Sequence, residues 1–149
     1  MSSGIYDPQT IRPENSIGYL INQARLELYY AIDQELVDLD VTAAQFGVMA
    51  RLAFGMANSP SALCKSLQYD PGAMTRMMDR LEAKGLILRT RDLKGDRRAV
   101  RLELTAQGKE MFPKLQSRVI GVLNRMLRGF TPDEAARLEG FLKRLIANA

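Results

Sequence analysis

Between residues 70 and 85, apolar side chains recur with the period of an α-helix. Met74, Met77, Met78 and Leu81 follow the spacing i, i+3, i+4, i+7, so they share one face. At about 100° per residue the opposite face is polar, and it carries Gly72, Thr75, Arg76, Asp79 and Arg80. Asp70 and Pro71 suit the first positions of a helix, and glycine at position 85 is a common helix end. The pattern predicts a short helix that is packed on one face and exposes two arginines on the other.

A two-stranded hairpin is predicted directly after this helix. Residues 86–91 are typical of a strand, and residues 92–96 have the composition of a turn. Residues 99–104 then alternate, with Val100, Leu102 and Leu104 on one face. Arg97 and Arg98 lie near the tip. A helix followed by a basic hairpin is typical of a winged helix-turn-helix, in which the helix enters the major groove of DNA and the hairpin tip reaches the minor groove.

The segment before residue 70 supplies the other helices of such a lobe. Thr42 and Gln45 form the T-x-x-Q pattern of a capping box, which opens a helix. Its expected inward positions are Phe46, Met49, Leu52 and Ala53. Residues 55–60 interrupt this helix, a short helix follows from Ser61 to about residue 67, and residues 68–69 make a tight turn. This order of elements is that of a helix-turn-helix.

Long amphipathic helices flank the lobe. One helical stripe runs from residue 17 to about 38, and another from 106 to about 128. A capping box at residues 131–134 opens a last helix, in which we expect the buried side chains to be Leu138, Phe141, Leu142 and Leu145. One small lobe cannot cover all of these apolar faces, which predicts a homodimer.

We therefore expect a mainly α (α+β) fold, a winged helix-turn-helix with N- and C-terminal dimerisation helices. The expected division is a flexible arm at 1–15, dimerisation helices at 16–40 and 106–149, and a DNA-binding lobe at 41–105. A two-fold dimer would place its two recognition helices about 34 Å apart on a pseudo-palindromic operator.

Positive charge is concentrated in the predicted helix and hairpin. Residues 70–101 hold nine Lys and Arg against five Asp and Glu, and this excess of four equals the formal net charge of the whole chain. Residues 1–40 have the opposite balance, with two arginines against seven acidic residues. A local basic surface of this kind is what binding to DNA phosphates requires.

Several classes of protein are excluded by composition. The chain has no histidine and one cysteine, which excludes histidine-dependent triads and the usual zinc sites. It also has no phosphate-binding loop and no dinucleotide-binding pattern. We therefore expect no enzymatic activity, no metal and no cofactor. No apolar run approaches the roughly 20 residues that span a bilayer, and the N-terminus lacks a secretory pattern, so we expect a cytoplasmic protein with no membrane partner.

The run from residue 67 to residue 111 resembles the MarR (multiple antibiotic resistance regulator) family of transcription factors. The resemblance lies in TRMMDRLEAKGLI at 75–87, DRRA at 96–99, and Leu104-Thr105 followed by Gly108. TAAQF at 42–46 is similar to the start of the second helix of the family. The likeness extends from about residue 17 to the C-terminus. It implies a homodimer that binds palindromic double-stranded operator DNA and represses transcription.

The resemblance also implies roles for single residues. Thr75 and Arg76 would face bases, and Arg80 would lie nearer the DNA backbone. In the hairpin, Arg98 would enter the minor groove, held by Asp96 across the turn.

Three further positions complete the expected DNA-binding set. Arg97 would add positive charge beside Arg98. Gly72 and Ala73 stand where the family commonly has hydroxyl residues. Small residues there allow helix amides to approach a phosphate, or a methyl group to contact thymine.

The resemblance further implies a small-molecule effector, often a phenolic or aromatic carboxylate, that binds between the lobe and the dimer helices and releases DNA. Arg25, Tyr29 and Tyr30 lie near that place, and an arginine with tyrosines suits an aromatic carboxylate. The alternative is that these three side chains belong to a dimer interface.

Two other functions remain open at this point. Cys64 is either a redox-sensing thiol or inert packing beside Leu63. The lobe could also be a winged-helix module that binds protein rather than DNA.

Overall fold

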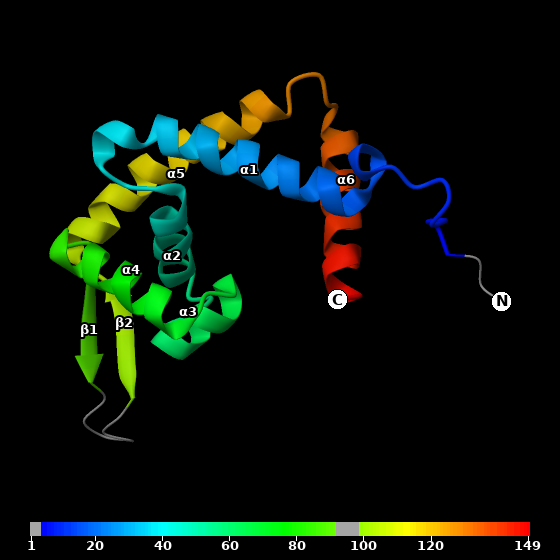
Figure 1. Ribbon diagram of the computed structural model, residues 1–149. Coiled ribbons are helices and arrows are strands. Elements are labelled where there is room, and N and C mark those ends of the chain that lie inside the picture. Colours follow the sequence, from blue (N-terminus) through cyan, green and yellow to red (C-terminus); the bar gives the residue numbers. More distant parts are fainter. Residues whose placement is uncertain (1–3, 92–98) are drawn as a thin grey trace.

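The structure is a computed structural model that describes residues 4–91 and 99–149. Its helices and strands follow in the order α1 (Ile17–Glu35), α2 (Ala43–Ala53), α3 (Pro60–Leu67), α4 (Pro71–Ala83), β1 (Ile87–Arg91), β2 (Val100–Leu104), α5 (Ala106–Met126) and α6 (Pro132–Ala147). Two 3-10 turns, η1 (Pro13–Asn15) and η2 (Val37–Leu39), flank α1. Figure 1 shows a lobe of α2, α3, α4 and the two strands below α1 and α5, with α6 apart from the lobe. The mainly helical fold with a two-stranded wing is the predicted one.

Helix starts in this chain are set by side-chain caps. Each of the six α-helices in the described residues follows a residue whose side-chain oxygen accepts the backbone N–H three positions on, namely Ser16, Thr42, Ser59, Asp70, Thr105 and Thr131. Both predicted capping boxes are present. The start predicted at Ser61 is wrong by one residue. Helix α3 begins at Pro60, because Ser59 is the cap and proline is preorganised for the first helical position.

The core lies between α4 and the remaining elements of the lobe. Met74, Met78 and Leu81 of α4 are buried, as the apolar stripe predicts. They belong to one cluster of buried side chains that includes Met49, Leu63, Leu86, Leu102 and Leu115. The expectation that Ala53 faces inward is wrong. It is exposed, because the last turn of α2 extends past this cluster.

The β1–β2 hairpin, here called the wing, is antiparallel. Ile87 pairs with Leu104 and Arg91 with Val100, which confirms the predicted strands to within a residue. Leu102 also donates its backbone N–H to the carbonyl of Asn58 (2.8 Å), so the α2–α3 connection contacts the inner strand. The turn predicted at 92–96 lies outside the described residues.

Helix α5 begins in close contact with the end of α4. The Thr105 hydroxyl donates to the Gly85 carbonyl (2.5 Å) and accepts from the Gly108 N–H (3.0 Å). Gly85 has a φ of +73°, the left-handed conformation that glycine adopts freely. A Cβ at Gly108 would lie 2.2 Å from the Leu86 carbonyl oxygen. A glycine is therefore required where α5 crosses the chain leaving α4.

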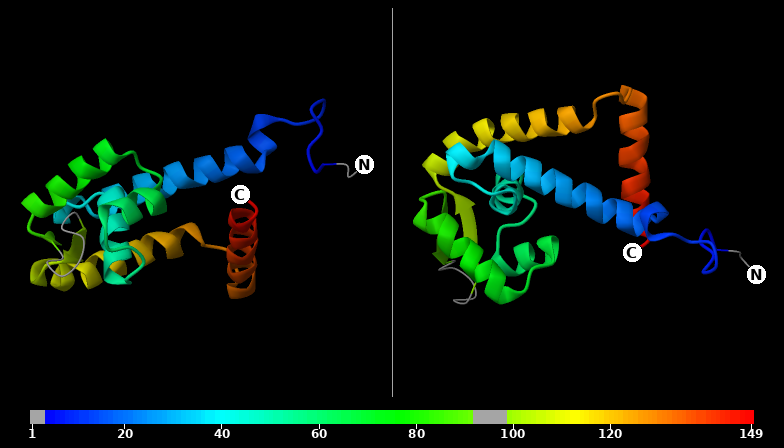
Figure 2. Two further views of the ribbon diagram at one scale, coloured as in Figure 1. Left: turned by 90° about the horizontal axis from the view of Figure 1, so that it is seen from below. Right: turned by 45° about the horizontal axis from the view of Figure 1, so that its top comes forward.

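The far parts of α1 and α5 extend beyond the lobe, and α6 runs from the end of α5 toward the start of α1 (Figure 2). Ion pairs join the end of α1 and the following η2 turn to α5. Arg125 Nη2 lies 2.8 Å from Glu35 Oε2, and Arg118 Nη1 lies 2.6 Å from Asp38 Oδ1. None of the described helices combines the length and the apolar character needed to cross a membrane.

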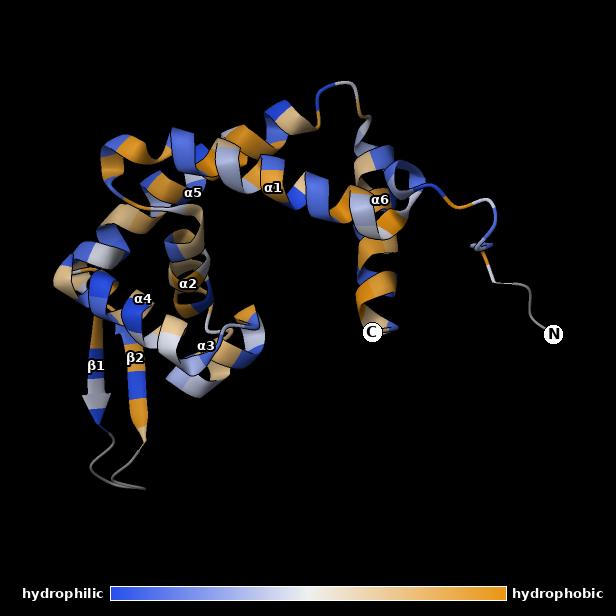
Figure 3. Ribbon diagram, viewed as in Figure 1, coloured by the Kyte–Doolittle hydropathy of each residue, from blue (hydrophilic) through white to orange (hydrophobic). Residues whose placement is uncertain are grey.

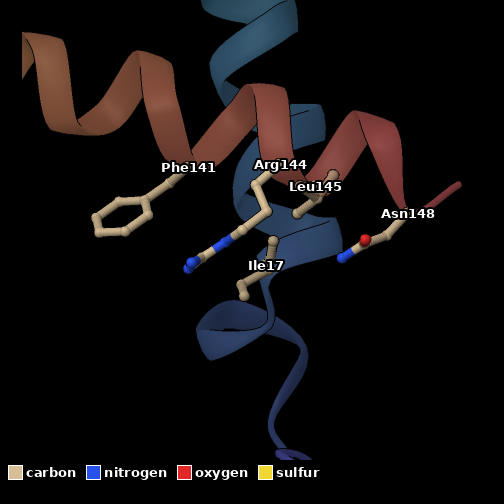
Figure 4. Close-up of a pocket in the computed structure, with 5 residues that line it drawn as sticks. All are labelled: Ile17, Phe141, Arg144, Leu145 and Asn148. Atoms are coloured by element: carbon tan, nitrogen blue, oxygen red, sulfur yellow. The ribbon is translucent and has the colours of Figure 1, made fainter.

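Helix α6 has no buried residue. The four side chains expected to be buried there, Leu138, Phe141, Leu142 and Leu145, are 39–57% exposed. Within one chain that expectation is wrong, because α6 stands apart from the lobe. Figure 3 shows apolar bands along α6, and Leu138 and Leu142 of α6 line one hollow with Leu20 at the start of α1. There Ile17, Phe141 and Leu145 lie around an open hollow, with the Arg144 guanidinium 5.3 Å from the Phe141 ring centroid (Figure 4).

The Arg118 hydrogen bond predicts how stability responds to acid. This bond lowers the pKa of Asp38 below its ordinary value. A lowered folded-state pKa stabilises the protein above the unfolded value of about 4, and the contribution is lost as pH falls through the folded value. We expect Asp38→Asn to melt below wild type at neutral pH and the gap to narrow between about pH 5 and pH 3. Thermal melts across that range measure it. In an Arg118→Met background, the same substitution should leave a smaller pH-dependent gap, because only the backbone hydrogen bonds to Asp38 then lower its pKa.

The contact at Gly108 predicts opposite effects for two glycine-to-alanine substitutions. Gly108→Ala should destabilise the fold by about 1–3 kcal/mol, since the new methyl group meets a backbone carbonyl that cannot rotate away. Gly140→Ala on α6 adds a methyl group with nothing within 4 Å, and it should be neutral or stabilise by up to about 1 kcal/mol. Urea denaturation of both variants tests this. Equal effects would contradict the assigned close approach.

Candidate nucleic-acid interface

The polar face of α4 is open to solvent beside the wing. Gly72, Thr75, Arg76 and Arg80 are all exposed, and Ala73 is half-buried. The buried methionines on the other side of α4 fix this orientation. The structure therefore brings the five described members of the predicted DNA-binding set together on one helix next to β1 (Figure 1).

The Thr75 hydroxyl is partly engaged within the helix. Its Oγ1 donates to the Pro71 carbonyl (2.8 Å). The hydroxyl can still accept a hydrogen bond, and its methyl group stays free. It cannot donate to a base acceptor without giving up the bond to Pro71. Thr75 is thus suited to accept from an amino group of adenine or cytosine, or to contact a thymine methyl group.

The first turn of α4 is organised around Asp70. The carboxylate accepts the Ala73 N–H (2.9 Å), so this amide is already paired. A Cβ at Gly72 would lie 3.2 Å from Asp70 Oδ1 and 3.4 Å from Arg76 Nη1. Glycine at 72 therefore leaves room for the Arg76 guanidinium at the N-terminal end of the helix. This role of Gly72 was not predicted from the sequence.

Arg89 joins the wing to α4. Its Nε lies 2.7 Å from Glu82 Oε2, and its Nη2 also pairs with Asp79. The hydrogen bond to Asp79 raises the pKa of the Arg89 guanidinium above its ordinary value. Arg89 offsets one of the two negative charges that would otherwise repel phosphate near the polar face of α4. From the sequence, Arg89 is only one of nine basic residues in segment 70–101. The one available signal is that Asp79 and Glu82, three residues apart, share a helix face and so favour a common basic partner.

Lys84 is also engaged within the protein. Its Nζ donates to the Asp40 carbonyl and to Gln45 Oε1 (2.9 Å). In the described part of segment 70–101, Arg76, Arg80, Arg91 and Arg101 are exposed and form no ion pair with another described residue. The charge available to DNA therefore comes from fewer side chains than the count of nine suggests.

The tip of the wing lies outside the described residues. Asp96, Arg97 and Arg98, which complete the predicted DNA-binding set, belong to this part. The strands that carry the tip are described, and their last pair is Arg91 with Val100.

The predicted effector residues lie on α1. The Arg25 guanidinium is 5.7 Å from the Tyr29 ring centroid, and Tyr29 packs against the core. Tyr30 is 66% exposed and, as the next residue of a helix, points about 100° away from Tyr29. The structure thus brings Arg25 and Tyr29 together, and Tyr30 lies on a neighbouring face.

Cys64 is half-buried on α3 and packs against the core. It lines a hollow of about 520 Å³ between α3 and α4, together with Pro71, Met74 and Thr75. The redox alternative for Cys64 stays a prediction.

Comparison with known proteins identifies the family. Residues 41–100 match the model of the MarR family. The chain is 35% identical over 137 residues to the multiple antibiotic resistance protein MarR of Salmonella typhimurium, covering 91% of this chain and 92% of that one. It is 36% identical over 94 residues to the transcriptional repressor MdtR of Bacillus subtilis, covering 63% of this chain and 60% of that one.

A solved structure agrees with this. A mutant of MarR from Escherichia coli complexed with operator DNA aligns with a TM-score of 0.77 and 33% identity, covering 87% of this chain and 92% of that one. These findings confirm the resemblance seen in the sequence. The chain belongs to the MarR family of transcriptional regulators, which are DNA-binding winged-helix proteins and not enzymes.

Proposed function

We propose that this protein is a repressor that binds a pseudo-palindromic operator as a homodimer and is released by a small aromatic carboxylate. The observation that carries the proposal is the exposed polar face of α4, with Arg76 and Arg80 beside the wing. The relative from E. coli that was solved with operator DNA supports it. Acting on chromosomal DNA places the protein in the cytoplasm.

On DNA, we assign Arg76 to base recognition and Arg80 to the phosphate backbone. Thr75 contacts the neighbouring base, either by accepting a hydrogen bond or through its methyl group. The small side chains of Gly72 and Ala73 let the first turn of α4 approach the DNA closely. In the wing, Arg98 enters the minor groove, Asp96 orients it, and Arg97 adds charge. Residues 41–105 then form the DNA-binding lobe.

The dimer is proposed from the apolar side chains beyond the lobe. The start of α1, the end of α5 and all of α6 expose large apolar residues, among them Leu20, Ile120, Phe141 and Ile146. Contiguous apolar surface of this kind marks an interface in a protein that is otherwise charged. We assign residues 16–40 and 106–149 to dimerisation, preceded by an arm at 1–15.

The effector site is proposed at Arg25, Tyr29 and Tyr30. A guanidinium stacked near a tyrosine ring offers a charged partner for a carboxylate and an aromatic face for its ring. An effector acts only if it binds the DNA-free conformation better, and a coupling of about 1–3 kcal/mol weakens operator binding roughly 5- to 150-fold.

The proposal predicts distinct roles for two arginines. Arg76→Ala should reduce the preference for operator over unrelated duplex by about 1–3 kcal/mol. Arg80→Ala should weaken binding to both duplexes equally and lower the slope of log affinity against log salt by about 0.9. Fluorescence anisotropy with duplexes from the chain's own upstream region, at several salt concentrations, measures both quantities.

Lys143→Ala on α6 is the matched control, because it removes the same charge far from α4. Aromatic carboxylates added to the complex should release it, and Arg25→Gln should abolish that release. No preference for any upstream duplex in folded, dimeric protein would contradict the proposal and favour a protein partner. Release by peroxide that Cys64→Ser abolishes would instead favour redox control.

The dimer can be tested on α6 alone. Leu142→Asp places a charge on the apolar face and should shift the protein toward monomer in sedimentation velocity. Lys143→Asp, one residue away on the polar face, should leave the dimer intact. Unchanged sedimentation of both variants would show that α6 lies outside the interface.

A further inference from the structure

We propose that Lys84 is a positioning residue that fixes the angle of α4 against the α1–α2 junction, defined here as residues 36–42. In this way it sets operator affinity without contacting DNA. The inference rests on the proposed function, since it names a residue that controls the same DNA-binding helix from behind. The sequence count had placed Lys84 among the residues available to phosphate.

The ammonium group of Lys84 is engaged by acceptors within the protein. Nζ donates to the Asp40 carbonyl and to Gln45 Oε1 (2.9 Å), and lies 3.7 Å from Asp40 Oδ2. An ammonium has three donors; two of them are used in these hydrogen bonds, and the Asp40 carboxylate adds a longer ion pair. The side chain is 26% exposed. Lys84 caps the C-terminal end of α4, where a positive charge is also favoured by the helix dipole.

Both acceptors belong to structures that cannot shift easily. Asp40 has a φ of 53°, a left-handed conformation that is uncommon outside glycine, and it ends η2. Gln45 is 4% exposed. Its Oε1 accepts the Thr42 N–H (3.2 Å) as part of the capping box of α2, and also accepts Lys84. Without Lys84, a buried amide oxygen and a main-chain carbonyl each lose a partner, which is unfavourable.

The same junction is held from its other side by the long helices. Arg118 of α5 donates to the Glu35 carbonyl (3.2 Å) and to Asp38 (2.6 Å). Asp33 of α1 accepts the Ala43 N–H at the first turn of α2 (2.7 Å). Residues 36–42 are therefore fixed to α1 and α5, and Lys84 fixes α4 to them.

The other polar attachment of α4 lies within the lobe. Arg89 ties Asp79 and Glu82 to the wing, and that contact moves together with α4. Among the described polar contacts, those of Lys84 are the ones that join α4 to the junction at the end of α1. Loss of these bonds would leave α4 packed in the core but free to tilt. In the proposed dimer, the spacing of the two α4 helices would then vary, and the two half-sites would be bound less tightly.

Lys84→Met tests the inference, because it keeps the apolar stem and removes the donors. We expect operator binding to weaken about 2- to 30-fold at every salt concentration, with an unchanged slope of log affinity against log salt. A phosphate contact would instead lower that slope by about 0.9. Lys114→Met, an exposed lysine of α5, is the matched control and should change neither affinity nor slope.

A second readout needs no DNA. Spin labels at Arg76→Cys on α4 and Glu27→Cys on α1, in a Cys64→Ser background, report the distance between the two helices. Mixing labelled protein with an excess of unlabelled Cys64→Ser protein ensures that the measured distances join two labels within one chain. Lys84→Met should broaden the distance distribution, and Lys114→Met should not. Asp40→Asn keeps the carbonyl acceptor and suits the left-handed backbone, so it should give a smaller effect in the same direction even if Lys84→Met folds poorly.

The outcomes separate this inference from the proposed function. An unchanged distance distribution in both Lys84→Met and Asp40→Asn would overturn the positioning role, as would a lowered salt slope. If the unsubstituted protein binds no upstream duplex but Lys84→Met broadens the distribution, the operator proposal fails and the positioning role stands.

Discussion

Burial of the methionine face of α4 is the constraint on which the rest of this structure depends. Met74, Met78 and Leu81 point into the lobe, and burying each such side chain is worth about 1.5–3 kcal/mol. A helix held in this way cannot rotate about its axis, so its polar face is presented outward. The same apolar stripe that stabilises the lobe thereby decides which residues can meet DNA.

Charge is then divided between recognition and architecture. Arg76 and Arg80 stay exposed. Arg89 pairs with Asp79 and Glu82 and offsets one of their two negative charges, and Lys84 is bonded to the α1–α2 junction and to α2. Exposed ion pairs contribute little to stability, so the pairing by Arg89 matters more for the field that DNA meets. The positive field near α4 therefore depends on this pairing as well as on the exposed arginines.

The features predictable from sequence are those with local causes. Side-chain caps need a hydroxyl or carboxylate three residues before an amide, and Thr42, Asp70, Thr105 and Thr131 all show that spacing. The polar face of α4 follows from helical period alone. Partners distant in sequence do not follow in this way. Lys84 and Gln45 are separated by 39 positions, and no local pattern in the sequence predicts that they are in contact.

The last helix illustrates a different limit. Its apolar face is evident in the sequence, but the start of α1 covers that face only in part, and we propose that a second chain covers the rest. In the proposed dimer, a helix with no buried residue in its own chain is stabilised by contacts that depend on concentration. Folding of the C-terminal region is then linked to abundance. Under this proposal, lower expression reduces the fraction of chains that are dimeric as well as the number of chains, so operator occupancy changes more steeply than in proportion to expression.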